Sequence, residues 1–131
     1  VSRMASITSA YPQVRKKLVE LQKQMAKTTN VIMDGRDIGT CVLPEAQVKI
    51  YLTASVQTRA KRRYDEMIAK GENCSLAEIE ADIKERDERD MNRSVSPLKQ
   101  AEDAVLVDSS DLDIDGVVAR MRQICKEKAG L

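Results

Sequence analysis

The stretch Val48-Lys49-Ile50-Tyr51-Leu52-Thr53-Ala54-Ser55 joins a β-rich run to a polar end at which a helix can begin. Val, Ile and Tyr favour strands, whereas the hydroxyls of Thr53 and Ser55 suit the cap of a following helix. That helix carries Arg59 and is expected to end near Gly71. A strand followed at once by a helix is typical of α/β proteins, so this stretch indicates that fold class.

Working outward, the sequence predicts further elements on both sides. Before the quoted stretch we expect a helix from Pro12 with apolar residues at helical spacing, and then a short buried strand at Val31-Ile32-Met33. After it we expect a highly charged helix opened by the capping box Ser75–Glu78, a strand over 104–108, and a last helix between Asp113 and Gly130. Together these elements predict an α/β layer with parallel strands.

Composition narrows the class of protein. The chain has 131 residues, net charge +1 and only three aromatic residues, all tyrosines, so it suits one domain and argues against nucleic-acid binding by base stacking. No apolar run is long enough for a membrane span. Three widely spaced cysteines and the absence of histidine argue against a disulfide framework and a zinc site, and a reducing cytoplasm is the expected compartment.

The charged run from Glu85 to Arg93 is the most informative segment. On a helix Arg86, Asp90 and Arg93 share one face, because they stand at positions i, i+4 and i+7. Two guanidiniums beside a carboxylate suit a ribosyl phosphate, since arginines fork onto phosphate oxygens and a carboxylate accepts from sugar hydroxyls. The alternative is a solvated helix with ordinary ion pairs.

The segment Asp34-Gly-Arg-Asp-Ile-Gly-Thr40 follows the expected strand, which would place it at the carboxyl edge where α/β proteins bind ligands. Arg36 offers a phosphate fork, and Asp37 can accept from an exocyclic amine or brace an arginine. Ser6 and Arg15 are further candidates for the same site, and Arg59, Arg62 and Arg63 can meet a triphosphate. For each, the alternative is an ordinary turn, cap or surface charge.

Taken together, these segments resemble the bacterial cytidylate kinase family. The matching stretches are Ser6 with Arg15, residues 34–40, 49–55, 59–63 and 83–93, then Pro97-Leu98 and 101–104. The resemblance implies a P-loop NTPase-type parallel sheet flanked by helices, incomplete at its N-terminal side. It implies one domain over 1–131, with CMP-site elements in 1–40, lid-like helices in 55–93 and a last strand and helix in 104–130.

The resemblance also implies an activity, transfer of the γ-phosphoryl group of ATP to CMP or dCMP, and roles for single residues. Arg15 and Asp37 resemble the pair that reads cytosine, with Ser6 nearby. Arg36 and Arg93 resemble the arginines that hold the CMP phosphate. Arg86 and Asp90 resemble contacts to sugar and phosphate. The expected catalytic residues are Arg36, Arg86 and Arg93, and Arg62 and Arg63 are expected to contact ATP.

One family motif is absent from the sequence. No Gly-x-x-x-x-Gly-Lys-Ser/Thr loop occurs, although the family uses it near the amino terminus to hold the ATP phosphates and Mg²⁺. We therefore expect the main ATP and Mg²⁺ ligands to precede Val1, no metal site here, and association with another chain to complete the sheet. Two other functions remain open: a non-catalytic CMP-binding fragment, and a charged helical interaction module.

Overall fold

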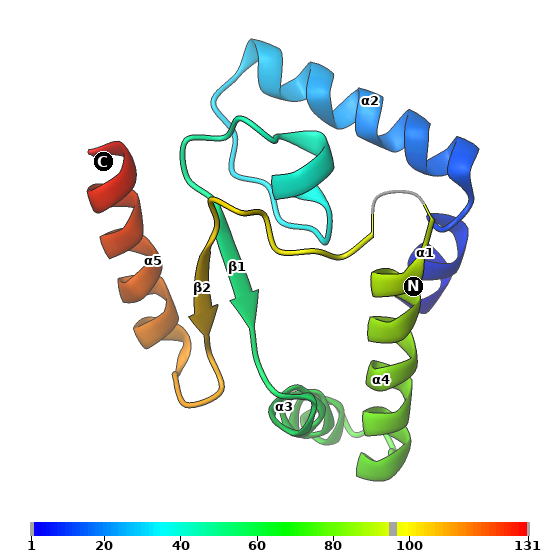
Figure 1. Ribbon diagram of the computed structural model, residues 1–131. Coiled ribbons are helices and arrows are strands. Elements are labelled where there is room, and N and C mark those ends of the chain that lie inside the picture. The colour runs from blue at the N-terminus through cyan, green and yellow to red at the C-terminus, as the bar shows by residue number, and fades with distance from the viewer. Residues whose placement is uncertain (1, 95–96, 131) are drawn as a thin grey trace.

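A computed structural model of the chain describes residues 2–94 and 97–130 (Figure 1). The elements are helices α1 (Ser2–Thr8) and α2 (Pro12–Thr28), the π-helix η1 (Ile38–Val42), strand β1 (Ile50–Thr53), helices α3 (Val56–Ala69) and α4 (Leu76–Asn92), strand β2 (Val105–Asp108) and helix α5 (Ile114–Ala129). The fold is a mixed α/β arrangement.

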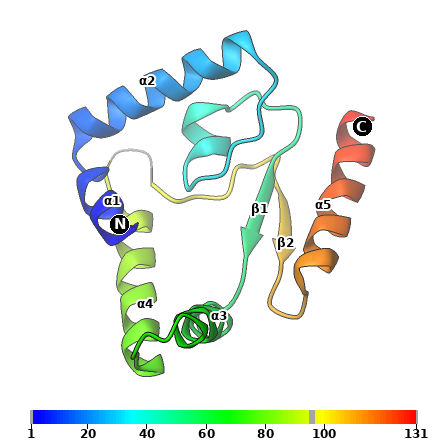
Figure 2. The same cartoon turned by 180° about the vertical axis from the view of Figure 1, so that it is seen from behind.

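The sheet of the described residues consists of β1 and β2. They pair in parallel, with Ile50 opposite Val105 and Thr53 opposite Asp108. Helix α5 packs beside β2, while α3 and α4 pack on each other on the opposite side of the sheet (Figures 1 and 2). The prediction of parallel strands flanked by helices is confirmed at this level.

Local capping chemistry fixes where several helices begin and end. The Ser55 hydroxyl accepts from the Thr58 amide at 3.1 Å, and the Ser75 hydroxyl accepts from the Glu78 amide at 3.4 Å. Asp113 caps α5 by accepting from the Gly116 amide at 2.7 Å. Gly130 ends the same helix with a φ of 68°, a left-handed conformation that glycine adopts without strain. These boundaries agree with the sequence predictions.

The predicted buried strand at Val31–Met33 is wrong. These residues have no regular structure, and the side chain of Ile32 is fully exposed. A strand needs a hydrogen-bonding neighbour, and β1 pairs with β2 instead. The reasoning that placed Asp34–Thr40 at the carboxyl edge of a strand therefore does not hold.

Two short helices were not anticipated from the sequence. Helix α1 contacts α4, and η1 packs against α2 with Ile38 and Val42 buried. At Gly35 the backbone passes so close to Ile38 that a Cβ atom would lie 2.9 Å from its side chain. This close approach explains the glycine before η1.

Much of the apolar surface is not covered by the described part of the chain. On α2, a stripe of four residues at helical spacing (Val14, Leu18, Leu21 and Met25) has exposed fractions between 38% and 58%. The neighbouring face of α2, which includes the buried Arg15, packs toward η1. Among the described residues, no helix has the length and apolar character needed to cross a membrane.

Candidate functional site

Asp90, near the end of α4, is the centre of a cluster of charged side chains. Only 1% of the residue is exposed. The Ser6 hydroxyl donates to its Oδ1 atom at 3.1 Å, and Arg36 forms an ion pair with its Oδ2 atom. The Asp90 carbonyl accepts from the Leu98 amide at 2.7 Å, so the chain beyond α4 is also tied to this position. A buried carboxylate is stable here because it has both a hydrogen-bond donor and a cation.

Two more arginines of α4 flank the same carboxylate. Arg86 Nε lies 3.9 Å from Asp90 Oδ2, and Arg93 Nη1 lies 3.7 Å from Asp90 Oδ1. Both are within ion-pair range but not within hydrogen-bond range. The prediction that these three residues share a helix face is confirmed, and the side chain of Arg93 is almost fully buried.

Arg15 and Asp37 form a second, adjacent pair. Arg15 Nε lies 3.8 Å from Asp37 Oδ2, and the two residues are 8% and 3% exposed. Neither of these two atoms has a hydrogen-bond partner. A buried polar atom without a partner is costly, so this pair is suited to a ligand that presents a donor to the carboxylate and an acceptor to the guanidinium.

The Asp90 cluster and the Arg15–Asp37 pair form one electrostatic unit. Burial lowers the pKa of Arg93, and the charges of Arg15 and Arg36 lower it further. Burial likewise lowers the pKa of Arg86, with Arg36 adding to the effect. Four guanidiniums thus oppose the two carboxylates of Asp37 and Asp90. The excess of two positive charges suits a phosphate monoester, which carries about −1.5 to −2 charges at neutral pH.

The cluster is assembled from four separate parts of the chain. Ser6 comes from α1, Arg15 from α2, Arg36 and Asp37 from the segment before η1, and the remaining residues from the last turns of α4. Figure 1 shows α1 beside the end of α4, with α2 starting close by. All seven residues predicted for CMP are brought together in this way.

The two arginines predicted for ATP lie elsewhere, on α3. Arg62 donates to the Ser109 carbonyl at 2.6 Å and so ties α3 to the turn after β2. Arg63 pairs with Glu66 at 3.2 Å on the exposed side of α3. Their proposed role toward ATP stays a prediction.

Sequence reasoning missed one residue of the cluster. Arg89 donates from Nη1 to the Ser6 hydroxyl at 3.2 Å. It belongs to the charged run that drew attention to α4, one turn after Arg86, but nothing local in the sequence indicates that its partner lies 83 residues away. Arg59, considered as a phosphate contact, instead binds the Asp87 carboxylate with two hydrogen bonds.

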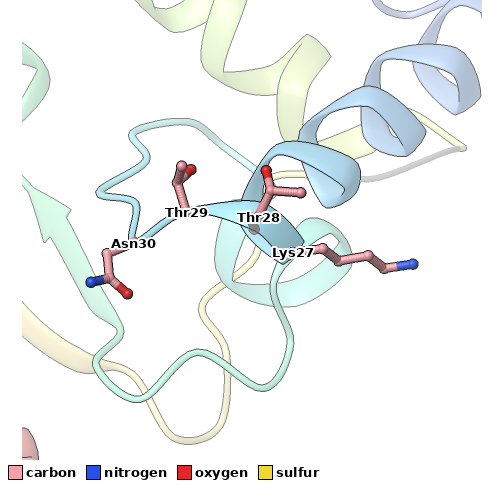
Figure 3. Close-up of a pocket in the computed structure, with 5 residues that line it drawn as sticks. Lys27, Thr28, Thr29 and Asn30 are labelled. Atoms are coloured by element: carbon pink, nitrogen blue, oxygen red, sulfur yellow. The ribbon is translucent and has the colours of Figure 1, made fainter.

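Neither a metal centre nor another candidate site competes with this cluster in residues 2–94 and 97–130. No group of three or more His, Cys, Asp or Glu side chains there could hold a metal ion. A polar hollow at the end of α2 is lined by Lys27, Thr28, Thr29 and Asn30 (Figure 3). The hydroxyls of Thr28 and Thr29 already donate to the Met25 carbonyl, and none of the predicted site residues lines the hollow.

Comparisons with known proteins identify the family of the chain. The family model for cytidylate kinase matches residues 1–127. Proteins named cytidylate kinase from Carboxydothermus hydrogenoformans, Desulfitobacterium hafniense and Alkaliphilus metalliredigens are 50%, 51% and 52% identical to this chain, each over 98% of its length. The chain spans 58%, 55% and 56% of the lengths of these relatives. On this match, the chain belongs to the cytidylate kinase family.

Proposed function

We propose that this chain is part of a larger enzyme, called here the complete protein, that transfers the γ-phosphoryl group of ATP to CMP or dCMP. The observation that carries the proposal is the convergence of four guanidiniums on the buried Asp37 and Asp90 carboxylates. A solvated helix with ion pairs does not bury its carboxylate to 1% exposure or recruit an arginine from a distant loop. A polyanionic ligand explains both features.

The positions suggest a role for each side chain. Arg36 and Arg93 hold the acceptor phosphate, while Arg86 and Asp90 contact sugar and phosphate. Arg15 and Asp37 face the base, because their polar atoms without partners match the mixed donors and acceptors of a cytosine edge. Ser6 lies next to this group through its bond to Asp90.

The mechanism follows from charge and position. In direct in-line transfer the protein mainly orients the two nucleotides and neutralises charge. Arg36 and Arg93 reduce the repulsion between the acceptor phosphate and the donor, and Arg86 offsets charge that spreads over the transferring group. These three are the proposed catalytic residues, because they contact the reacting phosphates.

The described part of the chain contains no group of three or more His, Cys, Asp or Glu side chains suited to a metal ion. The proposed Mg²⁺ ligands and the phosphate-binding loop for ATP belong to the part of the family polypeptide that this chain does not span. We place the lid function on the helices of residues 55–93, with Arg62 and Arg63 as ATP contacts, within a P-loop NTPase-type domain. The three cysteines are free thiols, which supports a cytoplasmic location.

We propose that the part of the family polypeptide that this chain does not span packs on the exposed apolar surfaces and completes the sheet. The apolar stripe on α2 is exposed, and β1 has a strand neighbour on one side only. A two-stranded sheet is only marginally stable by itself. In the complete protein, amide exchange in α2 and β1 is expected to be slow, and in the isolated chain fast. A cooperative melt of the isolated monomer at high temperature would contradict this association.

The test of the main proposal is turnover of CMP by the complete protein. Replacing Arg93 with Met is expected to remove about 3–4 kcal/mol of transition-state stabilisation, by analogy with removal of one oxyanion donor. This corresponds to a fall in kcat/KM for CMP of roughly two to three orders of magnitude. The exposed Arg122 on α5, replaced in the same way, is the matched control. Unchanged turnover of CMP in Arg93→Met would reject the assignment.

Two alternatives are distinguished by the isolated chain. A non-catalytic CMP-binding role predicts chemical-shift changes at Arg36 and Arg86 on addition of CMP, without formation of ADP when ATP is added. A charged helical interaction module predicts no shift at either residue. The buried Asp90 cluster favours the nucleotide-binding functions over the interaction module.

A further inference from the structure

Arg89 lies at the edge of the nucleotide cluster, where it contacts the proposed site only through another side chain. Its Nη2 atom donates to Glu85 on the same helix at 3.1 Å, and its Nη1 atom donates to the Ser6 hydroxyl at 3.2 Å. Arg89 is thus held in place from the solvent side and directed toward α1. Its ion pair is with Glu85, whereas Arg86 and Arg93 lie within ion-pair range of Asp90.

The Ser6 hydroxyl has a single proton, and the neighbours of its oxygen indicate where that proton points. Ser6 is 5% exposed, and its hydroxyl donates to Asp90 Oδ1 at 3.1 Å. A hydroxyl can rotate freely unless its lone pairs are also engaged. The N–H of Arg89 occupies a lone pair of the oxygen, so the proton is directed at the Asp90 carboxylate. Arg89 therefore donates to Ser6, and Ser6 donates to the Asp90 carboxylate.

Asp90 in turn fixes a residue of the proposed phosphate site. Its Oδ1 atom is held by Ser6, and its Oδ2 atom forms the ion pair with Arg36. If the first contact loosens, the carboxylate can turn about its χ2 bond and the Arg36 guanidinium moves with it. The position of Arg36 thus depends on a chain of three contacts that begins at Arg89.

We propose that Arg89 is a positioning residue of the nucleotide site, acting through the Ser6 hydroxyl to orient Asp90 and hence Arg36. The inference rests on the proposed function. Arg89 contacts neither nucleotide; it sets the geometry of groups that do. Its guanidinium forms an ion pair with Glu85, which offsets part of its charge.

The test is a double-mutant cycle in the complete protein, with KM measured separately for CMP and ATP. Arg89→Met is expected to raise KM for CMP about tenfold, the loss typical of one hydrogen bond in a charged network, and to leave KM for ATP unchanged. Arg89→Lys is expected to recover most of the loss, because one N–H donor suffices. In a Ser6→Ala background, Arg89→Met is expected to add nothing.

The outcomes separate this inference from its alternatives. Additive losses for Ser6→Ala and Arg89→Met, or an equal rise of KM for ATP, would show a general structural role and overturn the inference. So would a normal KM for CMP in Arg89→Met, with Arg122→Met as the arginine control. If the unaltered complete protein does not phosphorylate CMP, the proposed function itself fails and this inference fails with it.

Discussion

Arg59 of α3 binds Asp87 of α4 through two hydrogen bonds, 3.0 Å and 2.7 Å long, between the ends of its guanidinium and both carboxylate oxygens. The remaining Nε atom of Arg59 donates to the Ala54 carbonyl at the end of β1, also at 3.0 Å. One side chain therefore connects the sheet, α3 and α4. Asp87 lies on the same helix as Arg86, Asp90 and Arg93, so this contact joins α3 to the helix that carries much of the Asp90 cluster.

Breaking that connection is expected to weaken the packing of α3 on α4. Asp87→Asn in the complete protein should reduce the free energy of unfolding by about 1 kcal/mol, a modest value because both side chains are partly exposed and water screens the pair. Urea unfolding measures the change. The double swap of Arg59→Asp with Asp87→Arg should restore part of the loss, whereas an equal loss in Asp87→Asn and in the double swap would contradict a specific pair.

Asp90→Asn is expected to be the most damaging conservative change in the site. The amide keeps the shape of the side chain but leaves the Arg36, Arg86 and Arg93 guanidiniums without their shared negative charge. Removing one partner of a buried ion pair costs about 3–5 kcal/mol of unfolding free energy. Thermal and urea unfolding of the complete protein test this, with the exposed Asp82 of α4, replaced by Asn, as the matched control. A loss no larger than in Asp82→Asn would be evidence against the central role of Asp90.

CMP is expected to relieve the charge repulsion within the cluster. Burial and neighbouring arginines lower the pKa of Arg86 and of Arg93, so their charged forms carry a free-energy penalty in the unliganded site. A bound phosphate compensates that penalty. Saturating CMP at about 100 times its Kd should stabilise the complete protein by roughly 2.7 kcal/mol, read as a rise in Tm. Cytidine, which has no phosphate, is the control, and an equal rise with cytidine would show that the arginines do not bind phosphate.

The cap of α5 gives a prediction independent of function. Asp113→Ala removes the 2.7 Å bond to the Gly116 amide and is expected to lower the unfolding free energy by about 1 kcal/mol. Asp113→Asn keeps an accepting oxygen and should lose much less. The neighbouring exposed Asp111, replaced by Ala, serves as the control in urea unfolding. Equal effects at the two positions would argue against the cap.

Acid is expected to remove two surface ion pairs. A hydrogen bond from Lys70 lowers the pKa of Glu66 below its ordinary 4.5. A hydrogen bond from Lys49 likewise lowers the pKa of Asp103 below its ordinary 3.8. Both carboxyls have lower pKa values in the folded state than in the unfolded state. Their contribution is therefore present in full above about pH 4.5 and is lost as pH falls through the folded values. Unfolding of Glu66→Gln should depend less on pH in that range than unfolding of the unaltered protein, and an unchanged dependence would contradict the assignment.

The sequence predictions were accurate where the interactions join residues that are close along the chain. Ser55, Ser75, Asp113 and Gly130 act on backbone groups a few residues away, so the helix boundaries that they determine could be read from the chain. The common face of Arg86, Asp90 and Arg93 follows from helix periodicity in the same way. Val31–Met33 has the composition of a strand, but composition supplies no pairing partner, and Val31 and Ile32 remain exposed.

The sequence by itself thus determined helices α2 to α5, the positions of strands β1 and β2, and the residue types suited to a nucleotide. The tertiary structure alone decided which partner each side chain has: Ser6 with Asp90 across 84 positions, Arg89 with Ser6, and Arg62 with the Ser109 backbone. The physical reason is distance. Caps and helix faces depend on neighbours within one turn of the chain, whereas a buried charged site forms only when the fold brings distant groups together and excludes water from between them.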